Sequence, residues 1–230
     1  PFSLQTSLRL GGRAKHQFSL DSDDDWKALA PLIGTCSQGL RVIGGGANLL
    51  VGDDTLDAVV VRLEDQSMLL EGNSLTVAAG CPIIKTVIYA AQQGLSGIEW
   101  GTSVPGTWGG ALAMNAGAYG GQTGDSVEWA EVLTRAGEIQ RIPGSMVEWH
   151  YRHSVWPVEV LCFLKLRINL TPGDKTLIRQ RQSEIATERK KKFPKAPCAG
   201  STFNNPPGES CGRLIENCGL KGHHIGGAMV

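Results

Sequence analysis

Apolar residues along this chain fall into short runs separated by glycine-rich turns, a spacing that predicts more strands than helices. Runs rich in β-branched and apolar residues predict strands at 40–43, 57–63, 74–79 and 158–170. Residues 128–142 predict a hairpin that turns at Ala136-Gly137.

Two segments have helical features instead. Pro82 opens one helix and Gly94 ends it, and one face is expected to carry its apolar residues, which are Ile83, Val87, Ile88 and Ala91. The second helix, at 174–192, is polar throughout and starts at Asp174 as a cap. Its closing lysines suit the negative end of the helix dipole.

Strands and helices without strict βαβ alternation indicate an α+β architecture. The character of the sequence changes after Thr171-Pro172-Gly173, so we place a domain boundary near residue 172. The first domain then spans 1–172. The second spans 173–230.

Composition narrows the class of protein. The 230 residues are 41% hydrophobic and 19% charged, as in soluble globular proteins, and 22 basic residues balance 22 acidic ones. The formal net charge is zero, so no overall basic charge indicates a nucleic-acid partner. No apolar stretch is long enough to predict a membrane span or a secretory signal. Six cysteines without a CxxC pair and histidines without a ligand spacing predict a cytoplasmic protein with reduced thiols and no metal.

Three glycines follow directly after the strand predicted at 40–43. Because glycine lacks a Cβ, successive N–H groups can point into one concave nest that binds phosphate oxygens. A tight turn needs fewer glycines, and no GxGxxG fingerprint is present, so we favour phosphate binding outside a Rossmann fold. The candidate residues are Gly44, Gly45, Gly46, Ala47, Asn48 and Leu49.

A longer run of small residues begins at Pro105. Its paired glycines precede a short predicted helix whose first N–H groups can face a pyrophosphate. Tight backbone packing explains either glycine cluster alone, whereas both together predict a grip on a dinucleotide. This second candidate set is Pro105, Gly106, Thr107, Gly109, Gly110, Ala111, Asn115, Ala116 and Gly117.

Residues 208–212 match the GxSxG elbow of serine hydrolases. That elbow requires a strand immediately before it, but Pro206 and Pro207 occupy the place. We therefore expect Ser210 to cap a helix at 212–217 that Gly219 ends, and a hydrolase is the disfavoured alternative.

Four strings in a fixed order resemble the UDP-N-acetylenolpyruvoylglucosamine reductase family. They are IGGGANLLV from Ile43, PGTWGGALAMNAGAYGG from Pro105, YRHS from Tyr151 and AGSTFNNP from Ala199. Residues 212–228 and 6–14 are similar to the family's shorter variety as well, so the resemblance covers nearly the whole chain.

This resemblance implies an FAD-binding domain of the vanillyl-alcohol-oxidase type, with two lobes at about 1–65 and 66–172, followed by a partial substrate-binding domain. It implies that NADPH reduces FAD and is replaced by a UDP-sugar enolpyruvyl ether, which receives hydride at C3 and a proton at C2 in peptidoglycan precursor synthesis. The flavin carries the redox chemistry, and the protein supplies placement and charge. We expect a monomer.

Residue roles follow from the matched strings. Ser201 corresponds to the family's proton donor, and Arg152 to the arginine that holds the substrate carboxylate. Tyr151, Lys192 and Asn205 correspond to substrate-binding positions. Without the resemblance, Arg152 is interpreted as a surface ion pair and Ser201 as a turn residue.

The sequence departs from the family at several points. His153 stands where aspartate is common, and Cys198 where serine or asparagine is frequent. The family continues past the position of Val230 with a glutamate that stabilises the enolic intermediate. We therefore expect flavin binding with poor turnover; a flavin-binding remnant without turnover and a related flavin oxidase are the alternatives.

Overall fold

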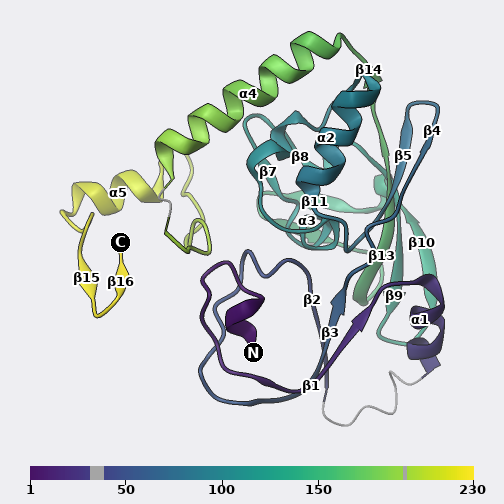
Figure 1. Cartoon of the computed structure of the whole chain (residues 1–230), viewed down its shortest axis with the longest axis horizontal. Helices are drawn as coiled ribbons and strands as arrows, with labels where there is room; N and C mark the ends of the chain where they lie inside the picture. The colour runs from purple at the N-terminus through teal and green to yellow at the C-terminus, as the bar shows by residue number, and fades with distance from the viewer. Residues whose placement is uncertain (32–38, 194–195) are drawn as a thin grey trace. The chain divides into compact units, whose positions relative to one another are not determined.

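A computed structural model of the protein describes residues 1–31, 39–193 and 196–230. Contacts divide the chain into two units, Pro1–Ala199 and Gly200–Val230. The described part of the first unit contains two main sheets, three two-stranded sheets and several helices, in agreement with the predicted α+β class (Figure 1).

A small parallel sheet is formed by the N-terminal part of the chain. Its strands, in the order β1-β3-β2, are β1 (Ala14–Leu20), β3 (Leu56–Leu63) and β2 (Leu40–Ile43). Helix α1 (Asp23–Leu29) follows β1 and begins at Ser22, whose hydroxyl accepts a hydrogen bond from the Asp25 N–H. Strands β2 and β3 confirm the predictions at 40–43 and 57–63.

The larger sheet is antiparallel and follows in sequence. Its strands, in the order β10-β9-β13-β5-β4, are β10 (Ile139–Pro143), β9 (Val127–Thr134), β13 (Val160–Asn169), β5 (Ser74–Ala78) and β4 (Met68–Glu71). The predicted hairpin at 128–142 is confirmed, because β9 and β10 pair on either side of Gly137, which has a positive φ.

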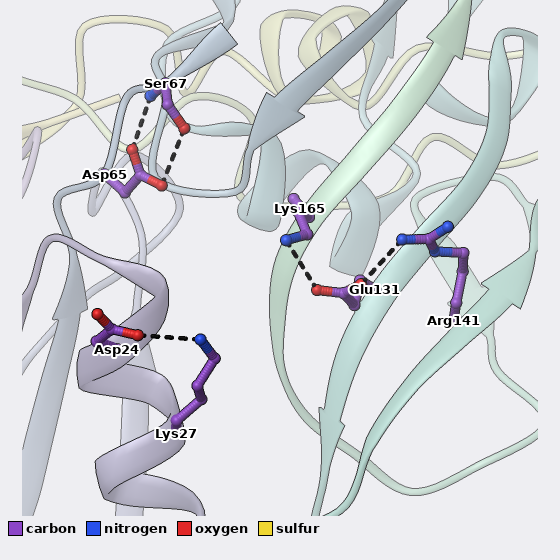
Figure 2. A network of polar contacts seen from close by, with 7 residues as sticks. All are labelled: Asp24, Lys27, Asp65, Ser67, Glu131, Arg141 and Lys165. Atoms are coloured by element: carbon purple, nitrogen blue, oxygen red, sulfur yellow. Dashed lines mark hydrogen bonds and ion pairs between the residues drawn. The ribbon is translucent and has the colours of Figure 1, made fainter. Parts of the chain in front are cut away.

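The two faces of this sheet differ in polarity. Figure 2 shows Glu131 of β9 between Lys165 and Arg141 on the flanking strands, with N···O distances of 3.1 and 3.3 Å. Its neighbours Ala130 and Val132 point to the opposite face and are fully buried in the core. One face is therefore charged and the other packs against helices, as strand alternation requires.

Helix α2 (Ile83–Gln93) begins after Pro82 and ends at Gly94, which has a φ of 74°, as predicted. One part of the prediction is wrong, because Ile88 is 48% exposed whereas Ile83 is 1% exposed. Five residues turn an α-helix by about 500°, so Ile88 lies roughly 140° from Ile83 around the axis. Ala90 takes its place in the core.

Helix α3 (Trp108–Met114) contacts β13 and β5 and lies beside the larger sheet (Figure 1). Helix α4 (Lys175–Lys192) begins at Asp174, whose carboxylate accepts hydrogen bonds from the N–H groups of Leu177 and Thr176. These two bonds lower the pKa of Asp174 below its usual value. The predicted cap and helix are confirmed.

Short elements connect the larger ones. They are η1 (Phe2–Leu4), β6 (Leu95–Ser96), η3 (Glu99–Ser103), β7 (Gly117–Ala118), β8 (Gly121–Gln122), η4 (Thr123–Asp125), η5 (Gly144–Met146), β11 (Glu148–His150), β12 (His153–Val155) and β14 (Thr171–Pro172).

In the described part of the chain, no helix combines the length and apolar character needed to cross a bilayer.

The second unit contains α5 (Cys211–Asn217) and a small hairpin of β15 (His224–Ile225) and β16 (Ala228–Met229). Helix α5 begins at Ser210, and Gly219 beyond its end has a φ of 71°, so both end signals are as predicted. None of residues 200–230 is buried.

Candidate active site

The two glycine clusters lie against each other. A Cβ added at Gly45 would come within 2.8 Å of the Gly106 Cα, and one at Gly44 within 2.5 Å of the Thr107 Oγ1. Real Cβ atoms do not approach so closely, so neither position has room for a side chain. Backbone packing therefore explains part of the glycine content, as the plainer interpretation of each cluster required.

The Thr107 hydroxyl lies at this junction. Thr107 is 7% exposed, and its Oγ1 has no hydrogen-bond partner among the described residues. Thr107 also precedes α3 without capping it through its side chain. A buried hydroxyl without a partner costs free energy unless a ligand or solvent satisfies it.

The first cluster is also held by the N-terminal segment. The Gly46 carbonyl accepts a hydrogen bond from the Ser7 N–H at 3.0 Å. A Cβ at Gly46 would overlap the Gln5 carbonyl oxygen, and Gly46 has a φ of 62°. Ala47 approaches Gly106 from the same loop. The loop that contains Asn48 and Leu49 thus continues from a glycine that no other residue can replace without strain.

The second cluster is fixed by hydrogen bonds to the β5–α2 connection. The Gly109 N–H donates to the Ala79 carbonyl at 2.8 Å, and the Gly106 carbonyl accepts from the Ile83 N–H at 3.1 Å. Pro105 and Gly110 are exposed on either side, and Ala111 is buried against the core. The start of α3 is therefore rigidly attached to the larger sheet.

Asn115 lies at the opposite end of α3 and is 1% exposed. Its Nδ2 donates to the Gln122 Oε1 at 3.1 Å and to the His150 carbonyl at 3.0 Å. Its Oδ1 accepts from the Gly124 N–H at 3.0 Å. The amide thus joins three separate segments of the chain.

Ala116 and Gly117 continue from this point into a small hairpin. The Ala116 carbonyl accepts from both the N–H and the hydroxyl of Thr123, and Gly117 pairs with Gln122. The turn of the hairpin is Tyr119-Gly120, and both residues have positive φ, the type I′ geometry that suits twisted strands.

Tyr151 and Arg152 form the two-residue turn between β11 and β12, where His150 pairs with His153. Arg152 has a φ of 59°, which is uncommon for a residue with a side chain. Its guanidinium lies 5.0 Å from the centre of the Tyr151 ring. No described carboxylate forms a salt bridge with Arg152, so the surface ion pair considered from the sequence does not occur there.

Ser154 fixes the second strand of this hairpin. Its hydroxyl donates to the Leu112 carbonyl at 2.7 Å, lies 3.2 Å from the Ala113 carbonyl and accepts from the Trp156 indole N–H at 2.9 Å. No pattern in the sequence assigns Ser154 a role of its own. The only signal was its place in the YRHS string.

Lys192 is the last residue of α4 and forms an ion pair with Glu188 one turn earlier. The hydrogen bond from Lys192 to the Glu188 carboxylate and the negative charge of that carboxylate raise the pKa of Lys192 above its usual value. Arg181 of the same helix donates to the Tyr119 carbonyl at 3.3 Å, so α4 contacts the Tyr119-Gly120 turn.

Ser201 and Asn205 belong to the second unit, and both are exposed. The Asn205 Oδ1 accepts from the Cys211 N–H at 3.0 Å and so helps to start α5. Ser210 caps the same helix through its hydroxyl, at 3.4 Å from the Arg213 N–H. That capping role, with no strand before it, disfavours the hydrolase alternative.

The first unit thus brings together both glycine clusters, α3 and the Tyr151-Arg152 turn, while Ser201 and Asn205 lie in the other unit. Within the described residues, no three His, Cys, Asp or Glu side chains converge as a metal site would require. Cys36 lies outside the described residues, and the five described cysteines are free thiols.

Comparison with known sequences covers both parts of the chain. The model of the FAD binding domain family matches residues 18–143, and that of the UDP-N-acetylenolpyruvoylglucosamine reductase C-terminal domain matches residues 192–230. The reductase of Lactobacillus helveticus is 36% identical over 231 residues, which cover 100% of this chain and 78% of that protein. The chain belongs to the UDP-N-acetylenolpyruvoylglucosamine reductase family.

Solved structures agree with this assignment. The family's enzyme from Thermus caldophilus superimposes with a TM-score of 0.85 at 33% identity, over 100% of this chain and 82% of that one. Berberine bridge enzyme from Eschscholzia californica, at 16% identity and a TM-score of 0.56, shares only the fold. The predicted family and fold class are confirmed: an FAD-binding domain followed by part of the reductase C-terminal domain. The boundary near residue 172 stays a prediction.

Proposed function

We propose that this protein binds FAD and uses NADPH to reduce UDP-N-acetylglucosamine enolpyruvate to UDP-N-acetylmuramate, in the cytoplasm, as a step of peptidoglycan precursor synthesis. The proposal rests on family membership and on the arrangement of the glycine clusters, α3 and the Arg152 turn. FAD, when bound, would supply the hydride acceptor and donor. The chain's own residues would bind and orient the cofactor and the substrate, and one of them would protonate the substrate.

The junction of the glycine clusters fits the pyrophosphate of FAD. A single observation carries this point: the buried Thr107 hydroxyl has no hydrogen-bond partner within the described part of the chain and lies where Gly44 leaves no side chain in the way. Phosphate oxygens are strong acceptors for such a donor and for nearby N–H groups. We assign Gly44–Gly46, Ala47–Leu49, Pro105–Thr107 and Gly109–Ala111 to this cradle.

Arg152 is the residue best suited to hold the substrate's carboxylate. A guanidinium presents a rigid fork that matches a carboxylate in two hydrogen bonds. The turn has a left-handed backbone at Arg152, and no carboxylate among the described residues forms a salt bridge with this guanidinium. Charge develops on that carboxylate as C3 is reduced, so a fixed cation there would stabilise the transition state more than the ground state.

Ser201 would donate the proton to C2 of the enolpyruvyl group. A serine hydroxyl is a weak acid and requires a nearby cation or N–H groups to stabilise the alkoxide it leaves. We assign Tyr151, Asn205 and Lys192 to the UDP-sugar, with Lys192 at the diphosphate because α4 ends in three consecutive lysines.

A second candidate function is flavin binding without turnover. The absence of any buried residue at 200–230 favours it, because an exposed segment is poorly suited to fix a catalytic hydroxyl. The two candidates share the cofactor and differ only in the reaction of the reduced flavin with the UDP-sugar.

One experiment separates the possibilities. The purified chain is expected to be yellow, or to become yellow when reconstituted with FAD, and NADPH is expected to bleach the flavin. Reoxidation on anaerobic addition of the enolpyruvyl substrate would support the reductase. Bleaching without substrate-dependent reoxidation would support the binding-only candidate, and a protein that takes up no FAD would refute both.

The assignment of Ser201 has its own test. Ser201→Ala is expected to leave flavin reduction by NADPH unchanged and to slow reoxidation by the substrate about 10²–10⁴-fold, because only the second step uses the proton. Stopped-flow absorbance measures both steps. Thr202→Ala, which removes the neighbouring exposed hydroxyl, is the matched control and is expected to react as the unmodified chain does. Equal slowing of both steps in Ser201→Ala would contradict the assignment.

A further inference from the structure

We propose that Asn115 and Ser154 are positioning residues that lock the Tyr151-Arg152 turn onto α3. The inference rests on the proposed function, because it assigns the two residues to the placement of the substrate-binding arginine. It gives Asn115 a different role from that of a cofactor ligand. It also gives a role to Ser154, which the matched string alone leaves unexplained.

The two anchors hold the hairpin on both sides of Arg152. His150, two residues before Arg152, accepts from the Asn115 amide at 3.0 Å, and Ser154, two residues after it, donates to the Leu112 carbonyl at 2.7 Å. Both partners lie at the end of α3. The hairpin therefore cannot slide or tilt on α3 without breaking a buried hydrogen bond on one of its strands.

Both anchors are buried, so their hydrogen bonds are difficult to replace. Asn115 is 1% exposed and Ser154 is 8% exposed, and water cannot easily satisfy their partners. Three of the four hydrogen bonds that the Asn115 amide can form are made to protein groups. Little of this side chain is left for contact with a cofactor.

Aromatic packing supports the same hairpin from behind. The Trp149 ring would lie 2.5 Å from a Cβ at Gly124, so only glycine fits beneath it, and the Gly124 N–H donates to Asn115. Trp149 and Trp156 meet edge to face at 5.7 Å. Packing sets the strand positions, and the two polar anchors set the turn.

The left-handed backbone of Arg152 explains why a turn of this kind requires anchors. A residue with a side chain avoids this region, so an unrestrained turn would relax to other conformations. Each relaxed conformation would aim the guanidinium elsewhere. Misplacement by about 1 Å can reduce a reaction rate about 10²-fold.

The test uses Asn115→Gly. Glycine keeps the left-handed φ of 40° at the end of α3, so the helix end is preserved while the amide is lost. We expect FAD content and flavin reduction by NADPH to be unchanged and reoxidation by the substrate to slow about 10–100-fold. Ser154→Ala is expected to behave alike. Thr134→Ala, which removes a buried hydroxyl at the distant β9–β10 turn, is the control and should leave both steps unchanged.

Two further measurements distinguish positioning from general damage. In an Arg152→Ala background, Asn115→Gly should slow reoxidation less than about 3-fold, because positioning matters only when the guanidinium is present. In Asn115→Gly without substrate, amide hydrogen exchange should be faster than in the unmodified chain at residues 148–155. Exchange in β9 and β13 should be unchanged. A full additional loss in the double variant, or unchanged exchange in the hairpin, would overturn the proposal. Failure of the unmodified chain to reduce the substrate would instead refute the proposed function, and faster hairpin exchange would then still support the lock itself.

Discussion

At the scale of single residues, the most informative feature is the backbone strain at Arg152. The left-handed conformation costs a residue with a side chain about 1–2 kcal/mol relative to glycine. Glycine already occupies most such positions in this chain, including Gly46, Gly94 and Gly137. An arginine at a strained turn, without a described salt-bridge partner, indicates that its side chain serves something other than stability.

This strain gives a prediction in which two variants differ in stability and have the same activity. The free energy of unfolding of Arg152→Gly is expected to be about 1 kcal/mol higher than that of Arg152→Ala, because only glycine adopts the positive φ without strain. Both variants should lose substrate-dependent reoxidation equally, since both lack the guanidinium. Urea denaturation and stopped-flow absorbance provide the two measurements. Equal stability of the two variants would show that the turn is not strained.

At the scale of elements, the decisive arrangement is the contact between the two glycine clusters. The loop after β2 and the segment before α3 meet with backbone against backbone, and the Thr107 hydroxyl lies at their junction. Close packing and phosphate binding are therefore compatible: the contact of Gly45 with Gly106 brings the two sets of N–H groups near one another. Neither loop would make such a site alone.

A matched pair of glycine substitutions tests this contact. Gly45→Ala introduces a Cβ at 2.8 Å from the Gly106 Cα and is expected to push the clusters apart and weaken FAD binding at least about 10-fold, a loss of about 1.4 kcal/mol. Gly52→Ala, later in the same loop, has open space and no positive φ, so its FAD affinity should be unchanged. Fluorescence titration of the apoprotein with FAD measures both. Equal affinities would remove the junction from the binding site.

The elements that the sequence predicted correctly have local causes. Asp174, Ser210 and Gly94 act on their own helix ends, and the β9–β10 hairpin is made by neighbouring residues. Ile88 is apolar but lies roughly 140° from Ile83 around α2, so its apolar character alone indicates the wrong face of the helix.

Long-range features escaped prediction. Strand β1 is exposed along most of its length and has no clear alternation, and its parallel pairing with β3 joins residues about 40 positions apart. The candidate residues were found from glycine content and matched strings. The hydrogen bonds of Asn115 and Ser154 join segments some 35–42 residues apart, which no local pattern indicates.

At the scale of the whole molecule, the two units differ in how much they bury. The first has a continuous core that includes residues of both sheets, such as Val61 and Leu166, whereas residues 200–230 bury none. Most of the hydrophobic stabilisation therefore belongs to the first unit. Burial also raises the pKa of the Cys162 thiol, so this core cysteine resists ionisation and alkylation.

A chain that ends at Ala199 is accordingly expected to fold and bind FAD. Its melting temperature should fall by less than about 4 °C, the shift that roughly 1 kcal/mol produces in a domain of this size. Cys81 and Cys162 should stay protected from iodoacetamide until the protein unfolds, whereas the exposed Cys218 of the full chain should react at once. Loss of FAD binding, or early alkylation of the core thiols, would show that the second unit is needed for the fold.

The seven residues of α3 have a final consequence for how such a chain can vary. Thr107 precedes the helix and lies against Gly44, and Asn115 follows the helix and donates a hydrogen bond to the His150 carbonyl. An α-helix advances about 1.5 Å and rotates about 100° per residue, so one inserted or deleted residue would turn the hairpin anchored at Asn115 by about 100° relative to Thr107. Length changes should be tolerated at turns such as Gly72, where open space surrounds the backbone. They should be excluded from α3, because its length sets the distance and the angle between Thr107 and Asn115.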